Sequence, residues 1–304
     1  MATAETAQSN TSATVLPGLG LAGAAVAVTV WGAAGVVAKW LPLGALAIVV
    51  YRFASYAVLA GSARLIRRES LSMAAFVGSI RGGLWLAADV ALFFTAVKLT
   101  SVVNATIIGA LQPVLLTIYA VRFLGERVTR RDLVLGLVAL VGVAVIVLAG
   151  TSSGEASLLG DLCAVGALFA WSAYFVEAKR VDGVVSPVDF TISAAIVVAV
   201  TNVPLALLFG QSLAWPNASQ WFWLIALALG AGVLGHNLMN WSIVRIPLWL
   251  GSTFTLFVPV VSSALAWLVL DEPLSPIQII AMTTTVGALA ALVVLQPQRA
   301  QEAA

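Results

Sequence analysis

The stretch LQPVLLTIYAVRFLGERVT, residues 111–129, has a counterpart in FVPVVSSALAWLVLDEPLS, residues 257–275. Each has a proline near the start of an apolar run and a glutamate where charged residues return. Pro113 corresponds to Pro259, and the two glutamates correspond at the same offset. Self-similarity at a constant offset indicates an internal repeat. We therefore expect a fold that is built from two similar halves.

The composition of the chain excludes most soluble classes. Of its 304 residues, 61% are hydrophobic and 9% are charged, whereas a soluble domain has about 25% charged residues. In water such a chain would expose large apolar areas, so a membrane protein is expected. The net charge of +2 argues against nucleic-acid binding. The single cysteine, Cys163, excludes an internal disulfide and a thiolate metal cluster.

Ten segments are long and apolar enough to cross a bilayer, which requires about 20 mostly apolar residues. Short connections with charged or turn-forming residues separate them. Because lipid offers no partner to unpaired backbone groups, a single helical bundle is expected. The expected spans are 17–38, 43–63, 79–98, 102–124, 132–150, 157–178, 188–209, 219–242, 247–270 and 276–296.

Lysines and arginines are distributed unevenly between the two sides of this bundle. With the N-terminus inside, the outer connections hold only Lys39 and Lys98, whereas the cytoplasmic connections and the tail hold eleven basic residues. Arg52 and Arg81 fall within or at the edge of spans. Cytoplasmic connections are the ones enriched in positive charge. We therefore expect a multi-pass protein of the cell membrane, a bacterial inner membrane, with both termini cytoplasmic.

The two halves are expected to enter the membrane in opposite directions, because each contains five spans and five is odd. Trp31 recurs as Trp171. Lys39, which ends its span outside, recurs as Lys179, which ends its span inside. Inverted repeats of this kind are the construction of many secondary transporters.

The domain boundaries follow from the spans. We expect a disordered cytoplasmic N-terminus over residues 1–16, a first repeat over 17–150, a second repeat over 157–296 and a cytoplasmic tail over 297–304. The expected fold class is an all-α integral membrane protein with ten transmembrane helices in two inverted five-helix repeats.

These features resemble the drug/metabolite transporter superfamily, in particular the EamA-type ten-helix carriers. The matching residues are Trp31-Gly32 and Lys39, Arg52 in YRF, AVKLTSVVNATIIGALQPVL at 96–115, GER at 125–127 and LFVPVVSSALAWLVLDEPLS at 256–275. The resemblance covers roughly residues 17–296. It implies a central cavity lined by helices one to four and six to nine, with helices five and ten outside as a brace. It also implies alternating access and, in bacteria, export of amino acids or related metabolites.

Asp89 is the residue that an apolar span accommodates least easily. It lies near the middle of the third span, where an ionised carboxylate facing lipid costs about 2.5–3.5 kcal/mol, so it should face the interior or a wet cavity. The repeat offset places its counterpart at Gly235, next to His236 in the eighth span. Asp89 and His236 are therefore the leading candidates for substrate binding and proton coupling. The alternative is a buried hydrogen bond that locks two helices, for example from Asp89 to Arg52.

Basic and aromatic side chains complete the candidate cavity. Arg52 lies too deep in the second span to reach the interface easily, and its planar group suits Asp89 or a substrate carboxylate. Trp31 and Trp171 offer an apolar wall, a cation–π face and one donor, although helix packing alone also explains them. The remaining candidates are Trp85 and Phe93 on the helical face of Asp89, Asn240 on that of His236, and Tyr174, Asn237 and Thr106.

The prolines and glutamates of the repeated stretch are expected to act structurally. Pro113 and Pro259 free backbone carbonyls within their spans, which suits hinges between two access states and static kinks equally well. Glu126 and Glu272 lie beside the start of the next helix, where a carboxylate can accept hydrogen bonds from free N–H groups.

The sequence predicts a secondary active or facilitative transporter that exports small metabolites, with amino acids as the leading class. Neither a cofactor nor a metal site is expected, and no P-loop or common hydrolase motif indicates an ATP-driven pump or an enzyme. One alternative is an exporter of quaternary cations, with the tryptophans as a cage and Asp89 as counter-charge. The other is a membrane enzyme that uses Asp89 and His236 as an acid–base pair. The expected partners are a small-molecule substrate and the lipid bilayer, with the chain a monomer or homodimer.

Overall fold

The computed structural model describes residues 17–99, 108–149, 157–270 and 273–302. Every regular element in these ranges is helical. Eight helical segments are long and apolar enough to cross a membrane, and Gly18–Ala34 forms a shorter apolar stretch. The expected all-α membrane fold is confirmed. The fourth expected span, 102–124, lies partly outside the described residues.

The first half supplies helices α1 (Pro17–Trp40), α2 (Ala45–Ile66), α3 (Met73–Leu99), α5 (Gln112–Phe123) and α6 (Arg130–Leu148). Between α5 and α6 the chain turns at Gly125, whose φ of 65° favours glycine. Helix α6 begins with a capping box, in which Thr129 and Asp132 each satisfy the other's backbone N–H.

The second half has the same order of spans, but two of them change helix type along their length. Its elements are α7 (Leu158–Arg180), α8 (Pro187–Leu208), α9 (Ala218–Leu227), the π-helix η1 (Ala228–His236), α10 (Asn237–Ile243), α11 (Leu248–Thr253), the 3-10 helix η2 (Phe254–Leu256), α12 (Phe257–Leu270) and α13 (Pro276–Glu302). The eighth expected span thus comprises α9, η1 and α10, and the ninth comprises α11, η2 and α12.

Local sequence determines where several of these helices begin. The Ser157 side chain accepts from a backbone N–H at the start of α7. Ser186 does the same for α8, which has Pro187 in its first turn. Asn217 and Gln220 form a capping box at the start of α9. Polar caps of this kind satisfy the backbone donors that a helix start leaves free.

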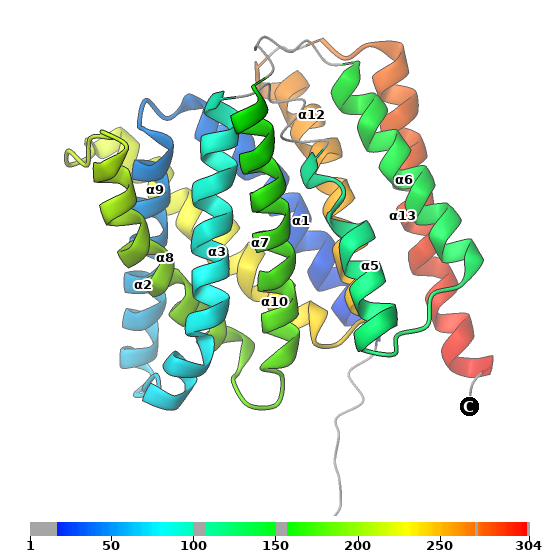
Figure 1. Ribbon diagram of the computed structural model, residues 1–304, viewed down its shortest axis with the longest axis horizontal. Helices are drawn as coiled ribbons and strands as arrows, with labels where there is room; N and C mark the ends of the chain where they lie inside the picture. The colour runs from blue at the N-terminus through cyan, green and yellow to red at the C-terminus, as the bar shows by residue number, and fades with distance from the viewer. Residues whose placement is uncertain (1–16, 100–107, 150–156, 271–272, 303–304) are drawn as a thin grey trace, which may run out of the picture.

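The helices are arranged as one bundle with a brace at its edge (Figure 1). Helix α3 packs along α7 and α8, and α2 also packs against α8. Helices α6 and α13 pack mainly against each other, and Gly142 of α6 allows close approach to Thr285 of α13. Helices α6 and α13 are the fifth and tenth expected spans, and they form the outer brace that the family resemblance implies.

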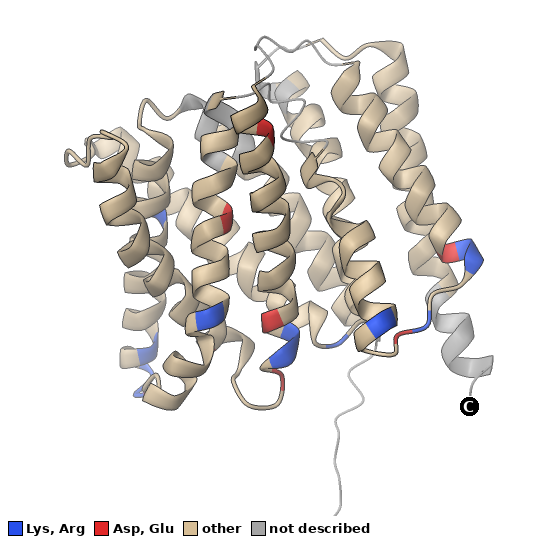
Figure 2. Cartoon of the chain, in the orientation of Figure 1, with Lys and Arg blue, Asp and Glu red and all other residues tan. Residues whose placement is uncertain are grey.

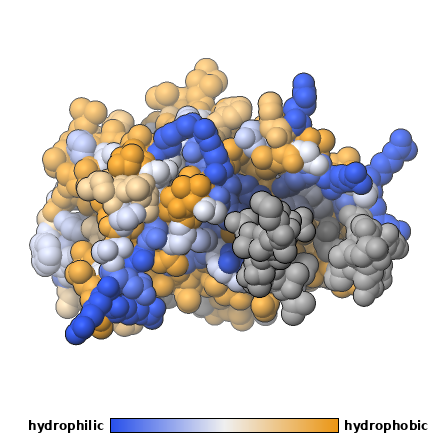
Figure 3. All heavy atoms as spheres, turned by 90° about the horizontal axis from the view of Figure 1, so that it is seen from below, coloured by the Kyte–Doolittle hydropathy of each residue, from blue (hydrophilic) through white to orange (hydrophobic). Residues whose placement is uncertain are grey.

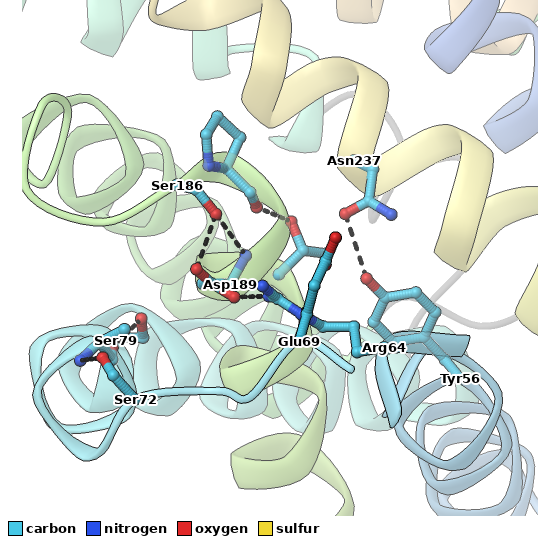
Figure 4. Close-up of polar contacts among 11 residues, drawn as sticks. Tyr56, Arg64, Glu69, Ser72, Ser79, Ser186, Asp189 and Asn237 are labelled. Atoms are coloured by element: carbon cyan, nitrogen blue, oxygen red, sulfur yellow. Dashed lines mark hydrogen bonds and ion pairs between the residues drawn. The ribbon is translucent and has the colours of Figure 1, made fainter. Parts of the chain in front are cut away.

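The outer surface of the bundle is apolar and one of its ends is basic. Large apolar side chains such as Val58, Val141 and Ile280 are exposed, as expected where helices face lipid. Lysines and arginines gather at one end (Figure 2), where hydrophilic side chains lie among apolar ones (Figure 3). At this end Arg64 of α2 pairs with Asp189 of α8 (Figure 4). Helix α1 begins and α13 ends on the same side (Figure 1).

Candidate functional site

A π-helix interrupts the eighth expected span. The run ALGAGVLGH forms η1 between α9 and α10, and such breaks in the α-helical ladder are frequent at functional sites. The Trp31 indole Nε1 donates to the Ala231 carbonyl oxygen at 3.2 Å. Gly235 has no side chain, so the Trp31 ring lies against its backbone. These contacts hold α1 against η1 and position the next residue, His236.

His236 lies in a cage of aromatic rings that both halves contribute. Its ring centroid is 5.2 Å from that of Trp31 and 5.8 Å from that of Phe53. The Tyr174 and Trp171 centroids lie at 6.2 and 6.3 Å. His236 is buried, and its Nδ1 has no hydrogen-bond partner among the described residues. The structure thus brings four of the expected candidates together and adds Phe53, whose apolar type gave no signal in the sequence.

Two asparagines after the π-helix form hydrogen bonds to neighbouring helices, although Asn240 Oδ1 is buried without a partner among the described residues. The Asn240 amide nitrogen donates to the Tyr174 hydroxyl at 2.7 Å and to Thr191 Oγ1 at 2.8 Å. Asn237 Oδ1 accepts from the Tyr56 hydroxyl at 3.1 Å (Figure 4). Because an unpaired buried polar group is costly, these bonds stabilise the packing of α10 against α2, α7 and α8.

Asp89 and Arg52 both lie half-buried within their helices, and no ion pair joins them in the described part of the chain. The Arg52 guanidinium lies 5.0 Å from the Phe53 ring centroid. The Arg52 Nε is buried and has no hydrogen-bond partner among the described residues. The helix-locking contact from Asp89 to Arg52 is therefore absent from this conformation.

An open cleft of about 600 Å³ lies between α3, α5 and α7, a volume typical of ligand sites. Along α7 it runs from Phe169 to Arg180, which is roughly 16 Å of helix. Trp85, expected on the face of Asp89, lines this cleft. Phe93, expected on the same face, is exposed and lies outside the lining.

Three charged side chains meet in the cleft. Arg81 Nη2 lies 3.0 Å from Glu177 Oε1, and Arg180 Nη1 lies 3.6 Å from the same oxygen. Glu177 is 8% exposed, whereas both arginines are 62% exposed. Arg81, Glu177 and Arg180 are not among the site residues predicted from the sequence. The three-residue spacing of Glu177 and Arg180 signals a helical pair, but nothing in the sequence connects them to Arg81.

One cation and one anion hold the connection between α10 and α11. Lys179 Nζ donates to the carbonyls of Ile243 at 2.7 Å and Ile246 at 2.9 Å. The Glu126 carboxylate accepts from the Leu248 backbone N–H at 2.9 Å. A cation is favoured at the C-terminal end of a helix, where Lys179 meets α10, and an anion at the N-terminal end, where Glu126 meets α11. We expected Glu126 to contact the start of the next helix, α6. It contacts the start of α11 in the other repeat instead, which corrects this expectation. Helix α6 has its own capping residue, Thr129.

The repeated prolines lie close to helix starts. Pro113 is in the first turn of α5, where a missing N–H removes no helical hydrogen bond. Pro259 is near the start of α12, directly after the 3-10 helix η2. Pro259 lies within the span that α11, η2 and α12 form together, and Pro113 follows the turn at residues 110–111 in the expected fourth span, so both prolines lie mid-span beside a break in the helix. Thr106 and Glu272 lie outside the described residues.

The chain is similar to known transporters. It is 28% identical over 207 residues to the uncharacterized transporter YyaM of Bacillus subtilis strain 168, covering 66% of this chain and 68% of that protein. It is 28% identical over 156 residues to the aromatic amino acid exporter YddG of Ancylobacter novellus, covering 50% of this chain and 52% of that one. The match to YddG thus spans only about half of either protein.

The fold also occurs among solved structures, and a family model covers both halves. One crystal structure matches 92% of this chain and 98% of its own chain, with a TM-score of 0.75 and 22% sequence identity. At that identity the likeness concerns the fold alone. The model of the EamA-like transporter family matches residues 18–148 and 158–294. The protein therefore belongs to the EamA-like transporter family.

Proposed function

We propose that the protein is a secondary carrier that exports small amphipathic metabolites, amino acids above all, by alternating access. The observation that carries this proposal is a difference between two helix contacts that the internal repeat relates to each other. The contact in one half is closed, and its counterpart in the other half is open.

The closed contact joins α1 to α12 at Gly32. An ideal Cβ at Gly32 would lie 2.6 Å from Val261 Cβ and 3.0 Å from the Val258 carbonyl oxygen. Ser262 Oγ also donates to the Gly32 carbonyl oxygen at 3.0 Å. Only a residue without a side chain permits this approach, so the two helices exclude solute at this point.

The open contact is the repeat counterpart of the closed one. Ser172 corresponds to Gly32, and Leu115 corresponds to Val261. Ser172 and Leu115 both line the 600 Å³ cleft. The cleft therefore occupies the place that the other half fills with a tight helix contact. Two equivalent contacts, one closed and one open, are what alternating access between inverted repeats requires.

The charge distribution indicates the side on which the cleft opens. Ser172 lies in the part of α7 that leads to Arg180, at the basic end of the bundle. Cytoplasmic ends are the ones enriched in Lys and Arg, so the cleft opens towards the cytoplasm in this conformation, as a carrier that loads its substrate for export requires. The relative named as an aromatic amino acid exporter and the aromatic lining of the cleft support amino acids as substrates.

Transport explains both repeats, and we propose no catalysis. Asp89 and His236 share no hydrogen bond in the described part of the chain, so their positions do not support the acid–base pair of an enzyme. The quaternary-cation alternative is decided by the experiment that tests the main proposal.

Counterflow in proteoliposomes tests the proposed function. Vesicles that contain the purified protein and unlabelled L-phenylalanine should accumulate external radiolabelled L-phenylalanine faster than protein-free vesicles. Tetraphenylphosphonium should not exchange. Exchange of the cation without exchange of any amino acid would overturn the amino-acid proposal in favour of cation export. Exchange of neither solute would also overturn it.

A further inference from the structure

This inference rests on the proposed export function. We propose that the cleft between α3, α5 and α7 is a loading site selective for zwitterionic α-amino acids with aromatic side chains. Arg81 and Arg180 receive the carboxylate, Glu177 receives the ammonium group, and the aromatic side chains of the three helices receive the substrate ring.

The cleft has two arginines and one glutamate, and the arginines are the more exposed side chains. Both arginines approach one oxygen, Glu177 Oε1, at 3.0 and 3.6 Å. A guanidinium has five N–H donors, so a single shared oxygen leaves most donors of Arg81 and Arg180 available. One positive charge is in excess, and both arginine side chains are 62% exposed. A substrate carboxylate can therefore bind both arginines by charge-assisted hydrogen bonds.

The same group of side chains also offers an acceptor for a cation. Both arginines approach Glu177 at Oε1, and a carboxylate has acceptor sites on both of its oxygens, so Glu177 can also accept from a cation. In an α-amino acid the carboxylate and the ammonium group are attached to one carbon. A site for both must place opposite protein charges within a few ångströms, as the Arg81–Glu177–Arg180 cluster does.

Aromatic rings line the cleft beside this cluster. Trp85 of α3, Tyr119 and Phe123 of α5, and Phe169 of α7 all belong to the lining. Trp85, Phe123 and Phe169 are exposed, and the Tyr119 and Phe123 rings pack at 5.1 Å. An aromatic ring of a substrate can stack on these rings favourably. The cleft thus combines a zwitterion site with an aromatic wall.

Calorimetric titration of the purified full-length protein with four compounds tests this site. L-Phenylalanine carries both charges and the ring, phenethylamine lacks the carboxylate, 3-phenylpropanoate lacks the ammonium group, and L-alanine lacks the ring. L-Phenylalanine should bind at least tenfold more tightly than each of the other three. Arg81→Gln and Arg180→Gln should each weaken its binding tenfold or more.

The control is Arg67→Gln, which changes an exposed arginine at the end of α2 that does not line the cleft. It should leave the affinity for L-phenylalanine unchanged. Glu177→Gln should reduce the preference for L-phenylalanine over 3-phenylpropanoate, a ratio that a purely structural role of Glu177 would not change.

The outcomes separate this inference from the proposed function. Equal affinity of the wild type and the two arginine variants would overturn the loading site even if counterflow is normal. Equal affinity for all four compounds would overturn it as well. Selective binding that the arginine variants lose, in a protein that shows no counterflow, would support the site and refute export.

Discussion

Replacing Gly32 by alanine tests whether the contact between α1 and α12 opens during transport. The added methyl group would lie 2.6 Å from Val261 Cβ, whereas carbon atoms in contact are about 3.5–4.0 Å apart. The Val258 carbonyl oxygen at 3.0 Å is backbone and cannot rotate away. The helices must therefore separate by about 1 Å, and such overpacking costs about 1–3 kcal/mol.

This cost falls on the conformation in which the contact is closed. A difference of 1–3 kcal/mol changes a two-state population ratio about 5- to 150-fold. Gly32→Ala should therefore raise the ratio of protein with an open interface to protein with a closed one by such a factor. The reporter is Ser262→Cys in a protein whose Cys163 is replaced by alanine, because Ser262 touches the Gly32 carbonyl. The rate of modification by a water-soluble maleimide measures the exposure. Gly136→Ala is the matched control, since a Cβ there meets no atom within 4 Å.

A rise in the modification rate that is specific to Gly32→Ala would support a moving contact. A rate within twofold of the parent, in a variant that is folded but less stable to heat, would show that the contact is static packing. In that case the open cleft at Ser172 would not be one of two exchanging states, and the argument for alternating access from these contacts would fail.

Three further substitutions have defined outcomes. Asp89→Asn keeps the shape of the side chain and removes its charge, so L-phenylalanine counterflow should fall while the melting temperature is unchanged; unaltered counterflow would show that the carboxylate is idle. Glu126→Gln weakens two charge-assisted hydrogen bonds at the start of α11 and should cost about 1–2 kcal/mol in thermal unfolding, whereas the exposed Arg127→Gln should have no effect. Asn240→Ala leaves the buried Tyr174 hydroxyl without its donor and should cost about 1–3 kcal/mol in the same measurement; a neutral result would mean that the hydroxyl finds another partner.

The apolar spans were sufficient to predict the membrane bundle, because lipid thickness dictates helix length and apolar composition. The repeated stretch added that the bundle has two similar halves. It did not predict the π-helix at Ala228–His236. The run ALGAGVLGH has the composition of any closely packed membrane helix. What distinguishes it is Trp31 from the other half, whose indole donates to the Ala231 carbonyl. A break that depends on a distant side chain leaves no periodic signal in its own segment.

The candidate site also contains residues that the sequence predicted and residues that it did not. Trp31, Trp171 and His236 were recognised because each has a repeat counterpart or lies beside one, and these residues do form one aromatic cluster. The pairing of Arg81 with Glu177 was not predictable, because it depends on how α3 crosses α7. The partners of Lys179 and Glu126 are backbone groups, which every residue carries and which sequence therefore does not mark.

The difference between Gly32 and Ser172 accounts for the side on which this conformation is open. At Gly32 the backbones of α1 and α12 meet directly, and Ser262 adds a hydrogen bond across the contact. Ser172 donates its hydroxyl to the Leu168 carbonyl of its own helix at 2.7 Å, so it gains no such bond if α5 approaches. Its side chain also prevents an approach as close as the one that glycine permits. In the proposed alternating-access cycle, the empty carrier therefore favours closure at Gly32. A ligand shifts a conformational equilibrium only by binding the two states unequally. A substrate that bridges α3, α5 and α7 supplies contacts that the empty cleft lacks, and closure at Ser172 then depends on loading.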